Sequence, residues 1–530
     1  MNEPVAERVY QQRWQGPPSS IAYEAAEIRE RLGDLAHPCF VVKDGRGVGV
    51  TNEGHLEPRR AEGLEALAVA RPLPPQRLGD PAFRETYGTG YAYMAGAMAN
   101  AISGEELVIA LGSAGLLGSF GAGGLTPARL ETALRRVQRA LPEGPYAFNL
   151  IHSPGEPALE RRVVDLYLEQ GVRTVEASAY LRLTPEVVRY RVAGLSLDAE
   201  GKIVIGNRII AKLSRREVAV QFLQPAPAAL LRELVEQGRV TEQQARLAGQ
   251  VPVADDITVE ADSGGHTDNR PLVCLLPSLI ALRNEIQAAE GYATPVRIGA
   301  AGGIGTPVAV LGAFMMGAAY VVTGSINHGC VEAGTSQSVK TLLAQAATTD
   351  VMMAPAADMF EMGVQVQVLK RGTLFPMRAR KLFELYQTYD SIEALPAAER
   401  TKIEKQIFRR SCAEVWQECI TFFSERDPEQ IRRAEGNPKR KMALIFRWYL
   451  GLATPWAVQG EEARKMDYQI WCGPAMGAFN DWARGTNLEE PQNRHAVDIA
   501  HRLLEGAARL YRLQELRLQG LRVPREWDVD

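Results

Sequence analysis

Cysteine is scarce in this 530-residue sequence, and its few cysteines are not arranged as a metal or redox site would require. The six cysteines lie far apart, except for Cys412 and Cys419, and no CxxC pattern occurs. Neither a zinc site nor a redox dithiol is therefore predicted, and no metal is expected. We interpret the cysteines as reduced, mostly buried thiols, which is typical of a cytoplasmic protein.

The chain also lacks a strong excess of charge, because its net charge is only −3 with 23% charged residues. Nucleic acid is therefore not expected as a partner, since such surfaces cluster positive charge. The first fourteen residues carry Glu3, Glu7 and Arg8 and contain no long apolar run. A signal peptide is not predicted from them, and export is not expected.

One long segment, residues 298–331, contains no Lys, Arg, Asp or Glu, and its length alone would admit a membrane-spanning helix. Eight glycines interrupt this segment, and residues 319–323 (Ala-Tyr-Val-Val-Thr) are typical of a strand. We therefore interpret it as a buried strand–helix–strand unit, and no membrane partner is expected.

Three familiar motifs are absent. Val308 occupies the position of the third glycine in a GxGxxG pattern that would start at Gly303, and no Walker A loop occurs. Ser119 is preceded two residues back by Leu117, where a nucleophile elbow requires glycine. A dinucleotide-binding fold and acyl transfer by serine are therefore disfavoured.

The sequence does contain short β-prone runs that alternate with amphipathic helical stretches between about residues 105 and 327. Such alternation predicts an α/β protein whose parallel sheet is covered by helices. Seven runs fit a TIM-type (β/α)8 barrel with one strand missed better than a doubly wound sheet of five or six strands. The predicted strands are Leu107–Leu111, Ala147–Ile151, Thr174–Ala177, Arg208–Leu213, Ile257–Ala261, Val296–Ala300 and Tyr320–Thr323.

Length and shifts in composition predict three parts. Residues 1–75 form an N-terminal region, residues 76–375 form the barrel, and residues 376–530 form a helical C-terminal region rich in Arg, Glu, Leu and Trp. Residues 215–255 are expected to be a helical insertion over the barrel mouth, because Thr241-Glu-Gln-Gln244 resembles a capping box. Self-association as a homodimer is expected if the C-terminal tryptophans are exposed, namely Trp416, Trp448, Trp456, Trp471 and Trp482.

Two glycine turns follow neighbouring late strands. The first, Gly302-Gly303-Ile-Gly305, precedes a helix with Thr306 as N-cap and Pro307 as first residue, and the second contains Gly324 and Ser325. Glycine lets the backbone approach a ligand closely, and barrels commonly hold a phosphate between two such turns. The alternative is a pair of tight turns without a ligand.

His266 stands out because two glycines precede it and no other His or Cys lies at metal-ligand spacing. We interpret it as a proton or hydrogen-bond donor, whose pKa Asp268 and Glu260 would tune. The alternative is a turn histidine bonded to backbone, and His152 and His328 are weaker candidates.

Asn149 and Lys212 are polar residues at the ends of apolar strands. A lysine inside a barrel needs an anionic partner, which is either a ligand phosphate or electron-rich ring, or an internal carboxylate. Five cations without an intervening acid, Lys370, Arg371, Arg378, Arg380 and Lys381, form either a solvated face or a docking site for an acidic protein or a cofactor phosphate.

From about residue 75 onward these features resemble the FMN-dependent nitronate monooxygenases and enoyl-acyl-carrier-protein reductases, and most closely the PfaD family. PfaD proteins are trans-acting enoyl reductases of polyunsaturated-fatty-acid and polyketide synthases. The similarity is carried by the segments 78–81 (LGDP), 91–100 (YAYMAGAMAN), 260–271 (EADSGGHTDNRP), 300–304 (AAGGI), 354–363 (APAADMFEMG), 369–378 (LKRGTLFPMR) and 471–480 (WCGPAMGAFN).

The resemblance implies a TIM barrel that holds FMN, is reduced by NADPH or NADH, and reduces the 2,3 double bond of an enoyl chain on acyl carrier protein. His266 matches the active-site histidine and is our candidate for the acid that protonates the α-carbon, with solvent as the rival. The positions implied to contact FMN are Gly112, Ser113, Ala114, Asn149, Lys212, Glu260, Gly265, Ala301, Gly302, Gly303, Gly324 and Ser325.

Smaller relatives often have Gly-Thr-Arg-Phe where this chain has Gly324-Ser-Ile-Asn327, so no contact from that arginine is expected here. The partners implied are acyl carrier protein and synthase modules. Two other functions remain open at this point: nitronate oxidation in a small pocket, and a flavin-binding docking module without turnover.

Overall fold

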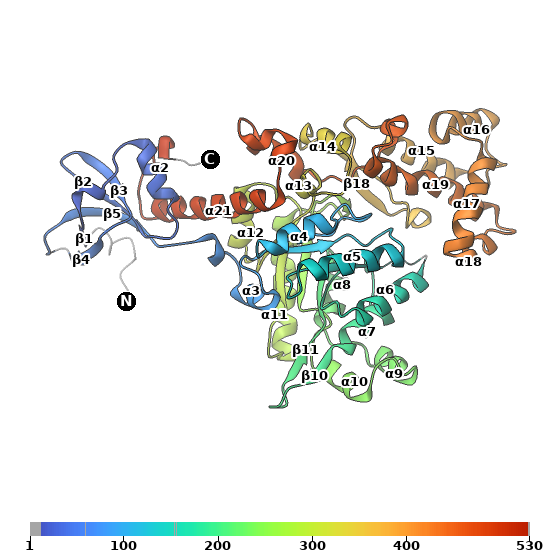
Figure 1. Cartoon of the computed structure of the whole chain (residues 1–530), viewed down its shortest axis with the longest axis horizontal. Helices are drawn as coiled ribbons and strands as arrows, with labels where there is room; N and C mark the ends of the chain where they lie inside the picture. Colours follow the sequence, from blue (N-terminus) through green and yellow to red (C-terminus); the bar gives the residue numbers. More distant parts are fainter. Residues whose placement is uncertain (1–11, 59, 153, 155, 528–530) are drawn as a thin grey trace.

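The computed structural model describes residues 12–527, apart from residues 59, 153 and 155. An N-terminal sheet lies at one end of the molecule, a barrel in the middle and a group of helices at the other end (Figure 1). The C-terminal helix α21 runs back from the barrel to the N-terminal sheet.

Eight parallel strands close into a barrel, because the last strand pairs with the first. The fold class is therefore confirmed as a TIM-type (β/α)8 barrel. In chain order the strands are β6 (Tyr93–Ala95), β7 (Leu117–Phe120), β8 (Ala147–Ile151), β9 (Thr174–Ser178), β12 (Arg208–Leu213), β13 (Asp256–Glu260), β15 (Arg297–Ala301) and β16 (Val321–Thr323).

The prediction of a strand at Leu107–Leu111 is wrong, because these residues lie in helix α4 (Glu105–Ser113). Glu105 and Glu106 occupy the first turn of that helix, where acidic side chains complement the helix dipole. Two short strands were not predicted, β6 and β7, which have three and four residues. An apolar run of five residues fits a buried helix as well as a strand, and this ambiguity caused the error.

Outer helices cover the barrel, and several begin as their sequences indicate. Thr126, Thr184 and Thr306 each precede a proline at the start of a helix, and each hydroxyl accepts a hydrogen bond from a backbone N–H of the first turn. The helices are α5 (Pro127–Ala140), α6 (Pro157–Glu169), α7 (Pro185–Ala193), α8 (Arg216–Leu223), α11 (Leu272–Glu290) and α12 (Pro307–Met315).

The uncharged segment 298–331 contains β15, α12, β16 and the short helix α13 (Ser325–His328), so the strand–helix–strand interpretation is confirmed. Within residues 12–527, with the three gaps given above, one helix is long and apolar enough to cross a membrane by length and composition, namely α11. In this fold α11 packs against β13 and β15.

The insertion between α8 and β13 is helical, as predicted, and contains α9 (Ala228–Glu236) and α10 (Glu242–Ala248). Both helices contact α7, and α10 also contacts the hairpin of β10 (Leu195–Leu197) and β11 (Ile203–Ile205). Its expected position over the barrel mouth is wrong. A segment that leads from a helix into the next strand lies where the strands begin, and Figure 1 shows α9 and α10 at that end.

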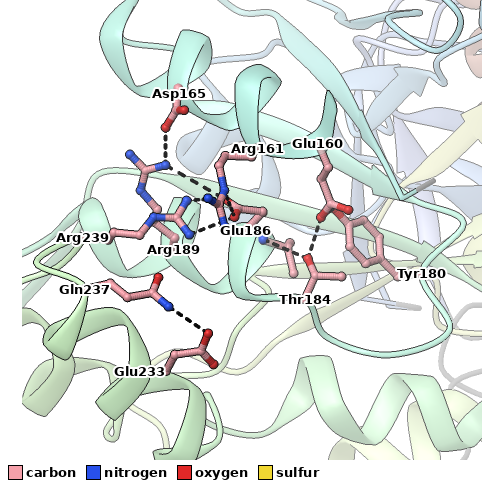
Figure 2. A network of polar contacts seen from close by, with 11 residues as sticks. Glu160, Arg161, Asp165, Tyr180, Thr184, Glu186, Arg189, Glu233, Gln237 and Arg239 are labelled. Carbon is pink, nitrogen blue, oxygen red and sulfur yellow. Dashed lines mark hydrogen bonds and ion pairs between the residues drawn. The ribbon is translucent and has the colours of Figure 1, made fainter. Parts of the chain in front are cut away.

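A polar network joins this insertion to the barrel helices (Figure 2). The buried carboxylate of Glu186 on α7 accepts hydrogen bonds from both terminal nitrogens of Arg239, which follows α9, and from Arg161 on α6 at 3.2 Å. Arg189 also lies 3.9 Å from Glu186 and pairs with Asp165. The network holds the insertion against α6 and α7.

The N-terminal region is a five-stranded antiparallel sheet in the order β3-β2-β5-β1-β4. Its strands are β1 (Gln12–Gln15), β2 (Cys39–Asp44), β3 (Gly47–Thr51), β4 (His55–Pro58) and β5 (Leu64–Ala70). Helices α2 (Ala25–Gly33) and α21 (Ala496–Leu518) cover one face, where Val41 and Ala68 pack with Leu513 and Leu516. Helix α3 (Pro81–Tyr87) leads into the barrel.

After the barrel, β17 (Val351–Pro355) and β18 (Gln365–Leu369) form a hairpin, to which the two-residue strand β14 (Gly265–His266) adds a third strand. The rest is helical, as predicted. Its helices are α14 (Gln337–Ala344), α15 (Phe375–Thr388), α16 (Ala397–Ile403), α17 (Cys412–Arg426), α18 (Pro428–Arg432), α19 (Pro438–Gln459) and α20 (Ala475–Ala483).

Two expectations for this C-terminal region have weak structural support. The five tryptophans are partly buried, not exposed, so they give no basis for a homodimer. Within the basic run, Arg378 pairs with Asp467, Lys381 with Glu399 at 2.8 Å, and Arg371 with Asp350 at 3.3 Å. Three of the five cations are therefore engaged inside the chain.

Candidate active site

A pocket opens at the carboxyl ends of the barrel strands, where side chains from several strands meet. Its walls come from the segments after β6, β12, β13, β15 and β16 and from the C-terminal region. The lining residues are Gly96, Ala97, Met98, Lys212, Glu260, Ser263, Gly264, Ala301, Gly302, Gly303, Ile304, Val322, Thr323, Gly324, Ser325, Trp471 and Ala475.

Seven of the predicted site residues lie together in this pocket. They come from four different strands and turns, which the closed barrel brings to one end. The seven are Lys212, Glu260, Ala301, Gly302, Gly303, Gly324 and Ser325.

Lys212 has an internal partner, because its Nζ lies 3.2 Å from Glu260 Oε1. The internal-carboxylate alternative for Lys212 therefore applies, although the lysine also lines the pocket. Burial lowers the pKa of Lys212, but the carboxylates of Glu260 and Glu176 more than offset this and raise it. Lys212 is consequently a permanent cation beside the pocket.

Glu176 on β9 lies beside this pair and is fully buried. Its Oε2 accepts a hydrogen bond from the N–H of Ala97 at 2.7 Å, whereas Oε1 has no hydrogen-bond partner among the described residues. An unpaired buried acceptor is costly. Glu176 itself does not line the pocket, and this acceptor lies behind Gly96 in the pocket wall.

The two glycine turns leave room for a ligand. A methyl group built on Gly303 or on Gly324 would meet no atom within 4 Å, and Gly303 has a φ of +77°. Close to them, Ser325 Oγ accepts a hydrogen bond from the N–H of Gly473 at 2.9 Å. A cation and two open glycine turns fit FMN, which carries ring carbonyl groups and a phosphate.

Gly265 and His266 lie next to the pocket residues Ser263 and Gly264, on strand β14. This strand pairs with β18, where Gly265 is opposite Gln367 and His266 is opposite Val366. The side chain of Gln367 donates hydrogen bonds to Asp262 Oδ1 at 2.6 Å and to the carbonyl of Ser263 at 2.8 Å. The histidine loop is therefore held by a hairpin outside the barrel.

The acid paired with His266 is Asp358, not Asp268. Both carboxylate oxygens of Asp358 lie 3.2 Å from His266 Nε2. Asp268 instead accepts hydrogen bonds from Ser214 Oγ at 2.5 Å and from Arg215 at 2.8 and 3.0 Å. The expectation that Asp268 tunes His266 is therefore wrong, because Ser214 and Arg215, just before α8, bind the Asp268 carboxylate instead.

The environment of His266 favours its protonated form. Burial lowers the pKa of the imidazole, but the negative charges of Asp358 and Glu260 and the hydrogen bond to Asp358 raise it above its usual value. This condition suits a group that donates a proton near neutral pH.

Five predicted cofactor residues do not line the pocket, namely Gly265, which lies next to it, and four others. Gly112 and Ser113 end helix α4 and Ala114 follows it, before β7 begins, so they are not in a turn after a strand as expected. A methyl group on Gly112 would meet Leu141 and the carbonyl of Pro145. The fourth, Asn149, is buried, and its amide donates to the carbonyl of Glu176 and to Ser178 Oγ, both at 2.9 Å.

The two weaker histidine candidates have structural partners. His152 bonds to Glu160 at 2.8 Å and stacks on Tyr180. His328 is buried, its Nδ1 bonds to the carbonyl of Trp471 at 3.1 Å, and burial lowers its pKa to about 4. Neither one lines the pocket.

Sequence reasoning missed residues from two parts of the chain that line the pocket, the segment after β6 and the C-terminal region. Gly96, Ala97 and Met98 follow β6, and a methyl group on Gly96 would lie 3.1 Å from Val322. This segment was part of the family resemblance, which was the available signal. Trp471 and Ala475 come from the C-terminal region, and no local pattern predicts that they reach the barrel.

Sequence comparisons match three families along the chain. A profile described as "Nitronate monooxygenase" matches residues 83–427. "Fatty acid synthase subunit PfaD N-terminal domain" matches residues 14–72, and "[Acyl-carrier-protein] S-malonyltransferase, inserted helical domain" matches residues 389–468.

Similar proteins come from synthase systems. The chain is 49% identical over 95% of its length to a polyunsaturated fatty acid synthase subunit of Thraustochytrium sp., of which it covers 34%. It is 45% identical over 82% of its length to polyketide biosynthesis protein PksE of Bacillus subtilis, of which it covers 56%. The chain thus spans about a third to a half of the length of these relatives.

A solved structure is similar to this chain along the whole length of that structure. It is the enoyl reductase domain of MlnA from the macrolactin biosynthesis cluster of Bacillus amyloliquefaciens, with 42% identity and a TM-score of 0.80. The match covers 84% of this chain and all of that domain.

Proposed function

Because this chain belongs to the nitronate monooxygenase family, whose members depend on flavin, we propose that it is an FMN-dependent enoyl reductase that acts in trans on a synthase. Its substrate would be an enoyl thioester on acyl carrier protein, and its reductant NADPH or NADH. The observation that carries this proposal is the similarity of this chain to a solved enoyl reductase domain, which the match covers completely.

The pocket supports the proposal through the groups it places together. The open turns at Gly303 and Gly324 would hold the phosphate of FMN, and Lys212 would lie beside its ring system. When bound, FMN supplies the hydride that the nicotinamide nucleotide delivers. The fixed cation Lys212 favours negative charge on a reduced ring.

In this proposal His266 supplies the proton. Reduction of an enoyl thioester needs a hydride at the β-carbon and a proton at the α-carbon. Burial lowers the pKa of His266, which lies at the edge of the pocket, but the charges of Asp358 and Glu260 raise it above its usual value. Solvent is the rival donor.

Two findings support a substrate carried by a synthase rather than a small, freely diffusing nitronate. They are the match of the N-terminal sheet to the PfaD N-terminal domain and the similarity to synthase subunits. Nitronate oxidation remains the alternative that the family match favours. Self-association as a homodimer also remains a prediction, which sedimentation would test.

Anaerobic stopped-flow absorbance separates these functions. Mixing the FMN-loaded protein with NADPH should bleach the flavin, and an enoyl thioester, not a nitronate, should then restore its colour. An inert docking module would show no bleaching. Bleaching of the oxidised flavin by a nitronate, with no reoxidation of the reduced flavin by the enoyl thioester, would select nitronate oxidation and reject the proposal.

We predict that His266→Ala slows reoxidation by the enoyl thioester about 10²- to 10⁴-fold while FMN remains bound. The physical reason is loss of the only imidazole at the pocket edge among the described residues. His55→Ala is the matched control, because His55 is exposed on the N-terminal sheet. An unchanged rate in His266→Ala would assign the proton to solvent.

A further inference from the structure

The only carboxylate bonded to His266 among the described residues comes from outside the barrel. Asp358 lies in the connection between β17 and β18, 92 residues further along the chain. The two groups are each about one-third exposed, at 33% for His266 and 32% for Asp358. They are therefore accessible at the pocket edge and yet linked by a hydrogen bond.

The position of Asp358 is fixed by apolar residues on both sides. Ala356 and Phe360 are buried in the core of the helical C-terminal region. The ring of Phe360 contacts those of Phe383 on α15 and Phe446 on α19. A carboxylate between two buried anchors has little freedom to leave the imidazole, so the pairing is built into the fold.

The geometry also distinguishes the two nitrogens of His266. Nε2 is bonded to Asp358, whereas Nδ1 has no hydrogen-bond partner within the part of the chain that the structure describes. A carboxylate that holds one ring nitrogen sets the orientation of the ring and leaves the other nitrogen for the substrate.

We propose that Asp358 is a positioning residue that holds the Nε2–H of His266, so that Nδ1 is the atom that delivers the proton to the substrate. This inference rests on the proposed function and names the group that prepares its acid. The Nδ1–H bond breaks as the α-carbon of the enoyl group gains its proton while the β-carbon gains the hydride from the reductant. His266 is left neutral, with its remaining proton on Nε2, and is reprotonated by water.

The other charged groups near the pair act in opposite directions on His266. Glu260 raises the pKa of His266 and Lys212 lowers it. Burial raises the pKa of Asp358, but the charge of His266, their hydrogen bond and Arg447 on α19 bring it below its usual value. Arg447 is itself held by Glu361 at 3.3 Å. Asp358 is therefore the ionised partner of a protonated His266.

The sign of the pH effect follows. Asp358 raises the pKa of His266, so the acid form persists to higher pH than in a chain without this carboxylate. In Asp358→Asn the titration of His266 should move to lower pH. The rate of proton delivery above that pKa should fall about tenfold for each unit by which the pKa drops.

The test has two readouts. Histidine NMR titration of the full chain would follow the imidazole signals in wild type and Asp358→Asn, with His266→Gln identifying the signal by its loss. The single-turnover rate of reoxidation by an enoyl thioester would be recorded from pH 6 to pH 9. Asp350→Asn, at the other end of the same hairpin, is the control for general damage to the hairpin.

We expect the His266 signal and the basic limb of the rate profile to move to lower pH together in Asp358→Asn only, with rates nearly equal to wild type at pH 6. A rate that falls by the same factor at every pH would overturn the inference in favour of a purely structural role. An unmoved NMR titration would also overturn it. Failure of the proposed function is separate, because then wild type would not react with the thioester although the NMR shift would still be seen.

Discussion

Gly303 has a left-handed backbone conformation and faces open space at the bottom of the pocket. An alanine there would adopt φ near +77° at a cost of roughly 1–2 kcal/mol, and its methyl group would enter the space proposed for the phosphate. The two effects can be separated, because only the second depends on the ligand.

We predict that Gly303→Ala raises the dissociation constant for FMN by about tenfold or more, equivalent to about 1.4 kcal/mol. Fluorescence titration of the apoprotein with FMN would measure it. Gly291→Ala is the matched control, because Gly291 has φ of +66°, faces open space and caps α11 away from the pocket. Equal FMN affinity in both variants would show that the phosphate does not lie at this turn.

At the scale of single residues, the sequence predicted the site residues whose partners are nearby in the chain or lie at the ends of neighbouring strands. Lys212 and Glu260 end neighbouring strands, so their meeting follows from the barrel itself. Asp358 could not be predicted as the partner of His266. Their contact depends on a hairpin that follows the barrel, and nearby Asp268 was the more obvious candidate in sequence.

Among the secondary-structure elements, most strands predicted correctly have five or six residues with strong β-propensity, such as β8, β12 and β15. The three-residue strand β16 was predicted as well, from the β-prone run Tyr320–Thr323. The three and four residues of β6 and β7 contain small residues and give no periodic signal. Their pairing is imposed by barrel closure, which local propensity does not encode. The same limit affected Gly112, Ser113 and Ala114, because the strand predicted just before them is part of helix α4.

The insertion of α9 and α10 was predicted as helical but placed at the wrong end of the barrel. Its anchoring network therefore provides a test of the corrected position. Glu186 pairs with Arg239, Arg161 and Arg189, and it is buried, so its removal leaves the arginines without their main anion.

We predict that Glu186→Ala destabilises the protein by about 2–4 kcal/mol, since breaking a buried ion pair strands the remaining charge. Amides of α9 and α10 should exchange with deuterium faster, while FMN affinity stays within about twofold of wild type. Glu233→Ala is the control, because Glu233 is exposed and bonds only to Gln237 among the described residues. A large loss of FMN affinity in Glu186→Ala would place the insertion functionally at the pocket.

For the whole molecule, α21 connects parts that are distant in sequence. It packs against α12 and α4 of the barrel and against β5 and α2 of the N-terminal region. Arg512 on this helix is almost fully buried, and it donates hydrogen bonds to the carbonyls of Leu32 at 3.1 Å, Asp34 at 2.6 Å and His37 at 2.7 Å.

We predict that Arg512→Ala loosens the N-terminal sheet without harming the barrel. One buried and two partly buried hydrogen bonds to carbonyls would be lost, at a combined cost of about 3 kcal/mol. Calorimetry should show a separate transition at lower temperature, and FMN affinity should be unchanged. Arg522→Ala, at an exposed position beyond α21, is the control.

A single transition that moves as a whole in Arg512→Ala would contradict this view and would indicate that sheet and barrel unfold as one unit. The division into an N-terminal region, a barrel and a helical region followed from length and shifts in composition, but the sheet in the N-terminal region was not predicted. The contact between α21 and the N-terminal sheet was not predicted from the sequence. It depends on which face of this long helix is still uncovered after the barrel has formed.

The sheet receives its cover late in biosynthesis. About 440 residues separate β5 from Leu513. At ribosomal rates of about 5–20 residues per second, the sheet would wait roughly 20–90 s for that helix to emerge. Over that interval Val41, Val50 and Ala68 lack the α21 side chains that pack against them in the finished protein. Chaperone binding to these first strands would protect the nascent chain from aggregation during this period.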